Sequence, residues 1–490
     1  MLRALLAAVF AFVAGSTLST PFASAAELDP KFIAWVEGTS EIGYRDLARR
    51  FLEAGKRDVS GYESALVQLE KRFRAFLDKN ENPSDPARRV DLLRRFIFVQ
   101  EGFSADLDLR DPDNLFPDSI VQRRRGFCLG LSLLLADLGE RLGWPLQIAA
   151  APRHTFVRYP GKPAINVETT LGGEIHDDDW YRRRYSVAKE RKELLRTLTP
   201  RESAAHLINN HGYVLLERGK QKDAEREFAR ALKLSPNLVE AKINRGVLRA
   251  RQSKFKEALT HFDAALAAWP GDAFVQLNRI NTLLALQRFD DAVTQLVTVA
   301  GTHPDLPGLD RAEQQLREHF QSSIAEPTMW RRLQRMVTGL NGARAERNKV
   351  PGLVGTYFSD SDLKKRQWSR VDRDLSFRWS WNSPGRGIPR DHFSIRWDGW
   401  LEVPADDKYT FFITCSDGVR IWIDGRQVIN SWRRANDSFP KGSIELLEGI
   451  HDIRVEYFES IGEAGIAIIL GSKKQERPLP LADHIFHTTP

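Results

Sequence analysis

Three residues whose side chains can carry out acyl transfer follow one another along the chain: Cys128, His154 and Glu168. Cys128 opens an apolar, helix-like stretch, where the positive end of the helix dipole favours a thiolate. His154 precedes a strand-like segment and is placed to take the thiol proton. Glu168 lies on the next strand-like segment, where a carboxylate can orient the imidazole and stabilise its charged form. These residue types in this order predict a nucleophilic cysteine.

Other assignments of these roles are open from the residues alone. Asn166 lies two positions before Glu168, on the same face of an extended strand, and competes for the place behind the imidazole. Gln122 is a possible donor to an oxyanion, although a glutamine in a loop is the more ordinary interpretation. A lone cysteine at the start of an apolar helix is more often a small buried side chain. An enzyme needs the Cys128 sulfur within hydrogen-bond reach of His154, with Glu168 or Asn166 behind the ring.

The elements that must position these residues are helices followed by a small sheet. Residues 66–77 and 91–100 have a helical, amphipathic pattern, and residues 127–142 form a strongly periodic apolar helix that Gly143-Trp144-Pro145 ends. Strand-like runs follow at residues 146–151, 155–159 and 164–170. Helices before a short antiparallel sheet indicate an α+β domain.

The motif blocks around the three residues are GFCLGLSLLLADLGERLGWP, APRHTFVR and INVETT. They resemble the transglutaminase-like superfamily, in the branch that is joined to tetratricopeptide repeats, over most of residues 30–190. The resemblance implies a cysteine-protease or transglutaminase-like α+β fold and chemistry through a thioester, of the peptidase, amidase or transglutaminase type. In the superfamily an Asp is followed two residues later by Thr, and here Glu168 and Thr170 take those places. Some members of this branch lack the nucleophile.

A 34-residue repeat follows, and its period is that of tetratricopeptide repeats. The repeated positions carry a closing proline, a small residue and an aromatic residue: Pro236, Pro270 and Pro304; Gly212 and Gly246; Phe228 and Phe262. In the third repeat Ile280 and Leu296 replace the glycine and the phenylalanine, which suits a terminal repeat. We predict a helical solenoid of three repeats over residues 203–305, with a helical cap and linker at 306–350. Docking of a protein partner and a spacer role are both open.

The sequence pattern changes after residue 350, where aromatic and β-branched residues alternate with polar ones. Strands are expected at 409–414, 419–423, 443–447 and 450–457, with Asp424-Gly425 as a hairpin turn, so residues 351–488 are predicted to form an all-β barrel or sandwich. GLVGTYF and SDGVRIWIDGRQVINSW resemble the protective-antigen-14 domain. That resemblance implies carbohydrate binding, in some members through calcium held by adjacent aspartates. Here Ser416-Asp417 stands instead, and the loss of one carboxylate argues against calcium. Asp417 and Trp432 are the candidate carbohydrate-binding residues; no other metal or cofactor is expected.

The bulk composition is that of a globular protein, with 28% charged residues and a formal net charge of +7. No motif for reading nucleic acid accompanies the basic residues, so nucleic-acid binding is not expected. Arg3, the apolar run Leu5–Ala14 and Ala23-Ser24-Ala25 predict a signal peptide at residues 1–25, hence export to the periplasm or the outside. No later run is long enough to span a membrane.

Two functions from different classes fit these observations. The leading hypothesis is an exported cysteine-dependent acyl-transfer enzyme, acting on a protein or peptide and held near a glycan or envelope substrate by the C-terminal module. The alternative is a non-catalytic envelope scaffold or adhesion protein that binds glycan and a protein partner.

Overall fold

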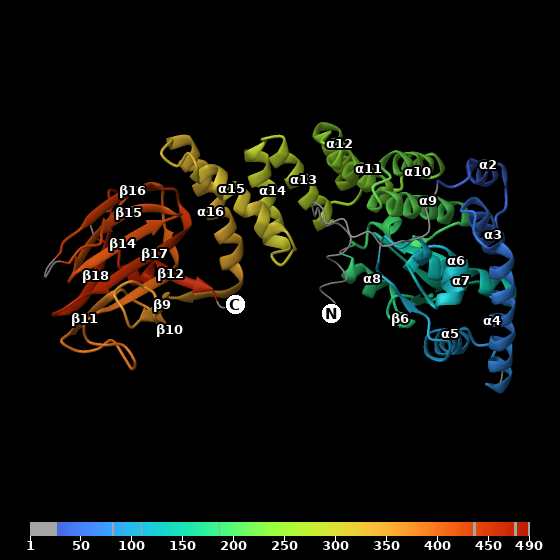
Figure 1. Cartoon of the computed structure of the whole chain (residues 1–490), viewed down its shortest axis with the longest axis horizontal. Helices are drawn as coiled ribbons and strands as arrows, with labels where there is room; N and C mark the ends of the chain where they lie inside the picture. The colour runs from blue at the N-terminus through green and yellow to red at the C-terminus, as the bar shows by residue number, and fades with distance from the viewer. Residues whose placement is uncertain are drawn as a thin grey trace. The chain divides into compact units, whose positions relative to one another are not determined.

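A computed structural model describes residues 27–490 except 81–82, 109, 186, 435–437, 475–477 and 489–490; of 346–348 it describes only the backbone. The chain forms two compact units, Met1–Thr282 and Leu283–Pro490, drawn in Figure 1. The predicted signal peptide lies outside the described residues. Within them, no helix combines the length and apolar character needed to cross a membrane.

The first unit begins with helices that surround a long buried helix. The helices are α2 (Pro30–Gly38), α3 (Tyr44–Ala54), α4 (Val59–Lys79), α5 (Pro86–Arg94), the π-helical turn η1 (Arg95–Gln100), η2 (Pro112–Asn114), α6 (Pro117–Arg123) and α7 (Cys128–Leu142). Eleven consecutive residues of α7, from Leu129 to Gly139, are buried. The helix ends as predicted at Gly143, whose φ of 70° is left-handed and suits glycine.

A five-stranded antiparallel sheet packs against α7, in the order β6-β5-β4-β3-β7. Its strands are β3 (Gln147–Ala151), β4 (His154–Tyr159), β5 (Ile165–Glu168), β6 (Glu174–His176) and β7 (Arg196–Thr197); α8 (Asp178–Arg184) and η3 (Lys192–Leu194) lie between the last two. A two-stranded ladder of β1 (Ser104–Ala105) and β2 (Arg125–Gly126) is separate. The predicted α+β architecture is confirmed.

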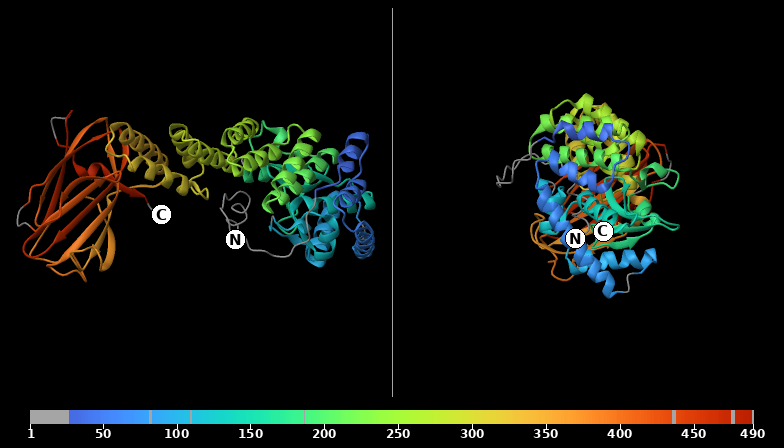
Figure 2. Two further views of the ribbon diagram at one scale, coloured as in Figure 1. Left: turned by 45° about the horizontal axis from the view of Figure 1, so that its top comes forward. Right: turned by 90° about the vertical axis from the view of Figure 1, so that its right-hand side faces the viewer.

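Paired antiparallel helices continue the first unit (Figure 2). They are α9 (Pro200–Glu217), α10 (Gln221–Leu234), α11 (Val239–Arg251), α12 (Phe255–Ala268) and α13 (Ala273–Ala285), which runs into the second unit. A Cβ on Gly212 would lie 2.8 Å from the Phe228 ring, and one on Gly246 would lie 2.6 Å from the Phe262 ring. The small residue and the aromatic residue of each repeat therefore fill one space, as the repeat pattern predicts.

The second unit contains α14 (Phe289–Thr302), α15 (Leu309–Gln321), α16 (Pro327–Asn348) and two β-sheets. The larger sheet has eight strands, with β10-β9-β12-β17-β14-β15 as its main path, and the smaller has the order β11-β18-β13-β16. The strands are β8 (Lys349–Pro351), β9 (Leu353–Phe358), β10 (Arg366–Asp372), β11 (Ser376–Ser380), β12 (Phe393–Val403), β13 (Asp407–Cys415), β14 (Gly418–Ile423), β15 (Arg426–Ser431), β16 (Lys441–Leu446), β17 (Gly449–Glu459), β18 (Ala464–Ser472) and β19 (Ile485–Thr488); η4 (Leu481–Asp483) precedes the last.

These two sheets form a sandwich, and the barrel alternative is wrong. Among the described residues no strand ladder joins one sheet to the other, so the hydrogen-bonded path does not close. Side chains such as Tyr357, Trp397 and Phe411 are fully buried between them. The hairpin between β14 and β15 has positive φ at Asp424 (49°) and Gly425 (81°), the turn that the Asp-Gly pair predicts.

Candidate active site and carbohydrate-binding region

Cys128 is the first residue of α7, and a short loop fixes its place. The Phe127 amide donates to the Asn114 carbonyl oxygen at 2.6 Å, and Ser104 and Ala105 pair with Arg125 and Gly126 in a parallel ladder. Backbone amides in the first turn of a helix have no partner within the helix, so those at the start of α7 are candidate donors to an oxyanion. Cys128 as a residue is partly exposed.

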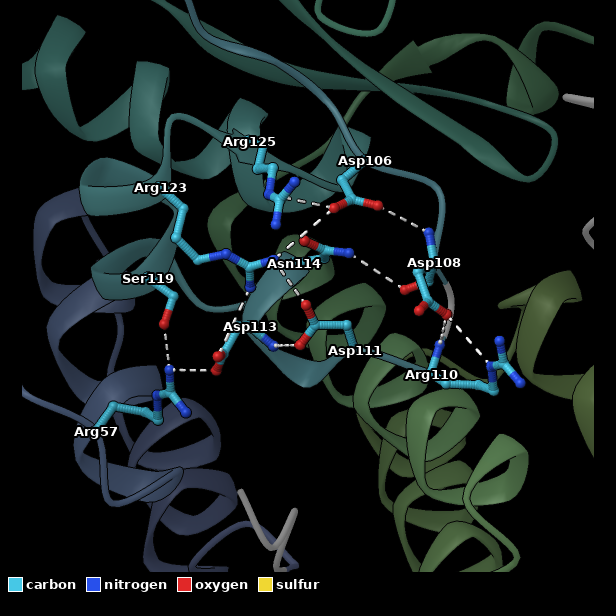
Figure 3. Close-up of polar contacts among 10 residues, drawn as sticks. All are labelled: Arg57, Asp106, Asp108, Arg110, Asp111, Asp113, Asn114, Ser119, Arg123 and Arg125. Atoms are coloured by element: carbon cyan, nitrogen blue, oxygen red, sulfur yellow. Dashed lines mark hydrogen bonds and ion pairs between the residues drawn. The ribbon is translucent and has the colours of Figure 1, made fainter. Parts of the chain in front are cut away.

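An ion-pair network braces the loops that lead to Cys128 (Figure 3). Arg123 pairs with Asp111 at 2.7 Å, and Arg125 with Asp106 at 3.5 Å. Arg57 reaches the same region and pairs with Asp113 at 2.7 Å. The positive charges that precede Cys128 in the sequence are thus compensated by nearby carboxylates. These ion pairs hold the loops in place. The pKa of the Cys128 thiol is set by groups that lie closer to the sulfur.

His154 and Glu168 stand on adjacent strands beside the sulfur. His154 opens β4 and Glu168 closes β5, and His154 Nε2 lies 2.7 Å from Glu168 Oε2. Both side chains are nearly inaccessible, at 8% and 1% exposed. The other carboxylate oxygen, Oε1, accepts from the Thr170 amide (2.9 Å) and hydroxyl (2.6 Å). The glutamate is therefore held at both oxygens, with one turned to the ring.

The electrostatics of the three groups favour charge separation. Burial acts to raise the pKa of the Cys128 thiol, but its hydrogen bond to His154 and the charge of that ring outweigh burial, and the pKa lies below its ordinary value. Burial lowers the pKa of His154, yet the Glu168 carboxylate raises it well above the usual range. The pKa of Glu168 is lowered, because His154 and Thr170 overcome the effect of burial. The arrangement stabilises a thiolate–imidazolium pair.

Two further residues complete the surroundings of this pair, and of these Thr155 was not identified from the sequence. Thr155, next to His154, lines the same cavity as Cys128, and its side chain and backbone lower the pKa of the Cys128 thiol. The Tyr185 ring stacks on the imidazole, with centroids 5.3 Å apart and planes at 14°. The position of Thr155 follows from the strand register beside α7, which no sequence motif signals.

The alternative residues for these roles are engaged or located elsewhere. Asn166 is fully buried, and its amide group accepts from Arg158 (2.8 Å) and donates to Asp178 (2.9 Å) and to the His176 carbonyl (3.1 Å). It is a support of the sheet, and Glu168 is the residue behind the imidazole. Gln122 lies on α6 and is not among the residues that line the cleft.

A cavity of about 220 Å³ opens over the Cys128–His154–Glu168 group. On one side the cavity is lined by Leu107, Phe127, Trp180 and Tyr185, and the opposite wall comes from the repeat helices. The residues of that repeat wall are His206, Asn209, Asn210 and Tyr213 of α9 and Glu240, Ile243 and Asn244 of α11. Asn244 Nδ2 donates to Asn209 Oδ1 at 2.9 Å. The repeat period predicts the helices, but not which of their faces meets another domain.

The candidate carbohydrate-binding residues lie in the second unit. Asp417 is buried at a positive φ of 58°, and its carboxylate accepts from the Ser460 amide at 2.6 Å. It therefore stabilises the turn between β13 and β14. The Trp432 ring lies 4.7 Å from Phe458, and the Arg420 guanidinium lies 3.8 Å from the Trp432 ring centre. Among the described residues, no three His, Cys, Asp or Glu side chains are grouped so as to hold a metal ion.

Comparison with protein-family models assigns the three regions. Residues 60–209 match the transglutaminase-like superfamily, 209–273 a tetratricopeptide repeat model, and 349–483 the PA14 domain. The chain carries these three domain types in that order. This agrees with the resemblances that the sequence motifs indicate.

Individual relatives share only parts of the chain. The anti-sigma-I factor RsgI3 of Acetivibrio thermocellus is 32% identical over 26% of this chain, which spans 20% of that protein. A UPF0162 protein of Xylella fastidiosa is 27% identical over 39% of this chain and 72% of its own length. Among solved structures, an anti-sigma factor domain-containing protein from Clostridium clariflavum is 33% identical, with a TM-score of 0.27 over 28% of this chain and 48% of that one.

Proposed function

We propose that this protein is an exported, cysteine-dependent acyl-transfer enzyme with Cys128 as nucleophile, His154 as general base and acid, and Glu168 as the orienting carboxylate. The observation that carries the proposal is the 2.7 Å contact between His154 Nε2 and Glu168 beside a thiol of lowered pKa. Since Nε2 is engaged by the carboxylate, Nδ1 is the ring nitrogen left for the sulfur. A structural cysteine and histidine have no need of this buried charge arrangement.

The proposed reaction has two steps. The Cys128 thiolate attacks the carbonyl carbon of an amide, so that a C–S bond forms and the C–N bond breaks. The imidazolium of His154 gives its proton to the departing amine, and backbone amides at the start of α7 stabilise the oxyanion. Water or a second amine then attacks the thioester, gives its proton to His154 and releases the thiolate.

The proposed substrate is an amide of a protein or peptide at the cell envelope. The asparagine side chains of the repeat wall, Asn209 and Asn244, suit the N–H and C=O groups of a peptide backbone. The PA14 domain supports glycan binding as the means of holding the enzyme near that substrate, with Trp432 as a stacking residue; the repeats offer a surface for a protein partner. A glycan array probed with the whole chain tests the targeting, and signal no higher than background contradicts it.

The enzyme activity is testable with p-nitrophenyl acetate as a simple acyl donor. In a Cys415→Ala background, we expect a nitrophenolate burst and an acetyl adduct on Cys128 that hydroxylamine removes. Cys128→Ala abolishes both, and Cys415→Ala alone retains them. Absence of the adduct, or an equal adduct in the Cys128→Ala protein, contradicts the proposal and favours the non-catalytic scaffold.

A further inference from the structure

The turn that carries the chain into His154 has an unusual backbone. Pro152 and Arg153 join β3 to β4, with Ala151 and His154 as the first cross-strand pair. Arg153 has a φ of 58°, in the left-handed region. Proline followed by a residue of positive φ is the pattern of a type II turn, in which glycine normally takes the second place. An arginine there adopts a conformation that its surroundings must maintain.

The first contact that maintains this conformation comes from the repeats. The Arg153 backbone amide donates to Glu240 Oε1 at 3.0 Å. Glu240 is the second residue of α11, so its position is fixed by a helix of the repeat array. The hydrogen bond acts on the Pro152–Arg153 peptide, one peptide unit before the one that joins Arg153 to His154.

The second contact is made by the Arg153 side chain, which is only 14% exposed. Its Nε lies 3.2 Å from Oδ2 of Asp272, a residue that is 1% exposed. The other Asp272 oxygen, Oδ1, accepts from the Phe274 and Val275 amides at 3.0 and 3.1 Å and so caps α13. A carboxylate buried to this degree depends on a nearby positive charge, and Arg153 supplies it.

Aromatic rings of the repeats enclose the same guanidinium. Its central carbon lies 5.4 Å from the Trp269 ring centre and 4.6 Å from that of Phe274. Planar guanidinium groups stack on aromatic faces in a way that an ammonium group does not reproduce. One arginine is therefore held at its backbone and at its side chain by α11 and by the α12–α13 connection.

We propose that Arg153 is a positioning residue for His154, and that the repeats, by holding it, are a structural part of the active site. The inference rests on the proposed function, because it assumes that the Cys128–His154 pair is the reactive one. Loss of the Arg153 contacts lets the turn relax and weakens the alignment of the imidazole with the sulfur. On this proposal the repeat helices of the first unit hold the residue before His154, which a simple spacer would not do.

The experiment measures alkylation of Cys128 by iodoacetamide as a function of pH, in the full chain with Cys415→Ala. The variants are Arg153→Gly, which accepts the left-handed backbone but lacks the guanidinium, and Glu240→Ala, which removes the acceptor of the Arg153 amide. We expect each to move the alkylation profile toward higher pH and to lower the rate below the thiol's ordinary pKa by about tenfold, the change in thiolate that one pKa unit represents. Glu240→Gln keeps an acceptor oxygen and is expected to retain the wild-type profile.

Lys56→Gly is the matched control, since Lys56 is another left-handed residue of the first unit, with a φ of 55°. It is expected to leave the profile unchanged. Thermal melts of all variants separate this role from a purely structural one, which lowers the melting temperature without moving the profile. If the wild-type thiol is activated but neither Arg153→Gly nor Glu240→Ala moves its profile, the inference about Arg153 is overturned and the proposed function is not. A wild-type thiol with an ordinary profile overturns the proposed function as well.

Discussion

Replacing Glu168 by glutamine keeps the size and the oxygen acceptor of the side chain but removes the charge that faces His154. The carboxylate is 1% exposed and lies 2.7 Å from the ring, so solvent screens the lost charge little. A hydrogen bond to a charged group contributes ~1.5–3 kcal/mol. At about 1.4 kcal/mol per pKa unit, the His154 pKa should fall by about 1–2 units and the pKa of the Cys128 thiol should rise correspondingly.

The assay is the rate of iodoacetamide alkylation between pH 5 and 10, in a Cys415→Ala background where Cys128 is the remaining thiol of the two in the sequence. Below the unperturbed thiol pKa of about 8.5, the Glu168→Gln rate should be lower by about 10- to 100-fold, and the two proteins should converge at high pH. Glu174→Gln is the matched control, since Glu174 contacts His176 at 3.0 Å and its side chain is 58% exposed. Identical profiles for Glu168→Gln and its parent refute the charge-pair reasoning.

The remaining predictions concern the support of the site, the repeats and the second unit. Thr170→Val removes one hydrogen bond to Glu168 and should slow alkylation of the thiol near neutral pH by about 2- to 10-fold, as a net ~0.5–1.5 kcal/mol implies; an unchanged rate contradicts it. Phe262→Ala should destabilise the α11–α12 pair by about 3–5 kcal/mol, seen as faster amide hydrogen exchange in both helices, and unaltered exchange argues against the packing described. Burial and the nearby Asp417 carboxylate raise the pKa of Glu459 from 4.5 to about 7, so the folded state holds a proton that the unfolded chain releases, and stability falls as pH rises between those values. The free energy of unfolding should fall by on the order of 3 kcal/mol over this pH range. Hydrogen exchange of the β17 amides measures this pH dependence, and Glu459→Gln should abolish it. A pH dependence that Glu459→Gln leaves unchanged contradicts the prediction.

Much of the local architecture is predictable because it depends on neighbours in sequence. The apolar period and Gly143 define α7, and the order of cysteine, histidine and acid leads directly to the group at its N-terminus. Thr170 donates a hydrogen bond to the Glu168 carboxylate, at the position that the resemblance to the transglutaminase-like superfamily implies. The glycine and aromatic positions of the repeats meet in space because helix pairs can approach closely only there.

The parts that sequence reasoning missed depend on contacts between distant elements. Alternating strands are compatible with a barrel or a sandwich, and strand pairing far apart in the chain decides between them. Glu240 and Asn244 appear in the sequence as ordinary helical surface residues, and only the docking of α11 brings them to the cleft. Arg153 has a backbone conformation that its residue type does not suggest.

The most direct test of the account is a titration of the thiolate itself. The ultraviolet absorbance of the wild-type chain minus that of Cys128→Ser reports ionisation of this sulfur without any substrate; Cys415, whose pKa burial raises to about 12, cancels in the difference. We predict that the thiolate forms at a lower pH than an ordinary thiol does, because the pKa of Cys128 is lowered. A difference spectrum that shows no thiolate until the pH exceeds about 8.5, the ordinary thiol value, contradicts the central claim.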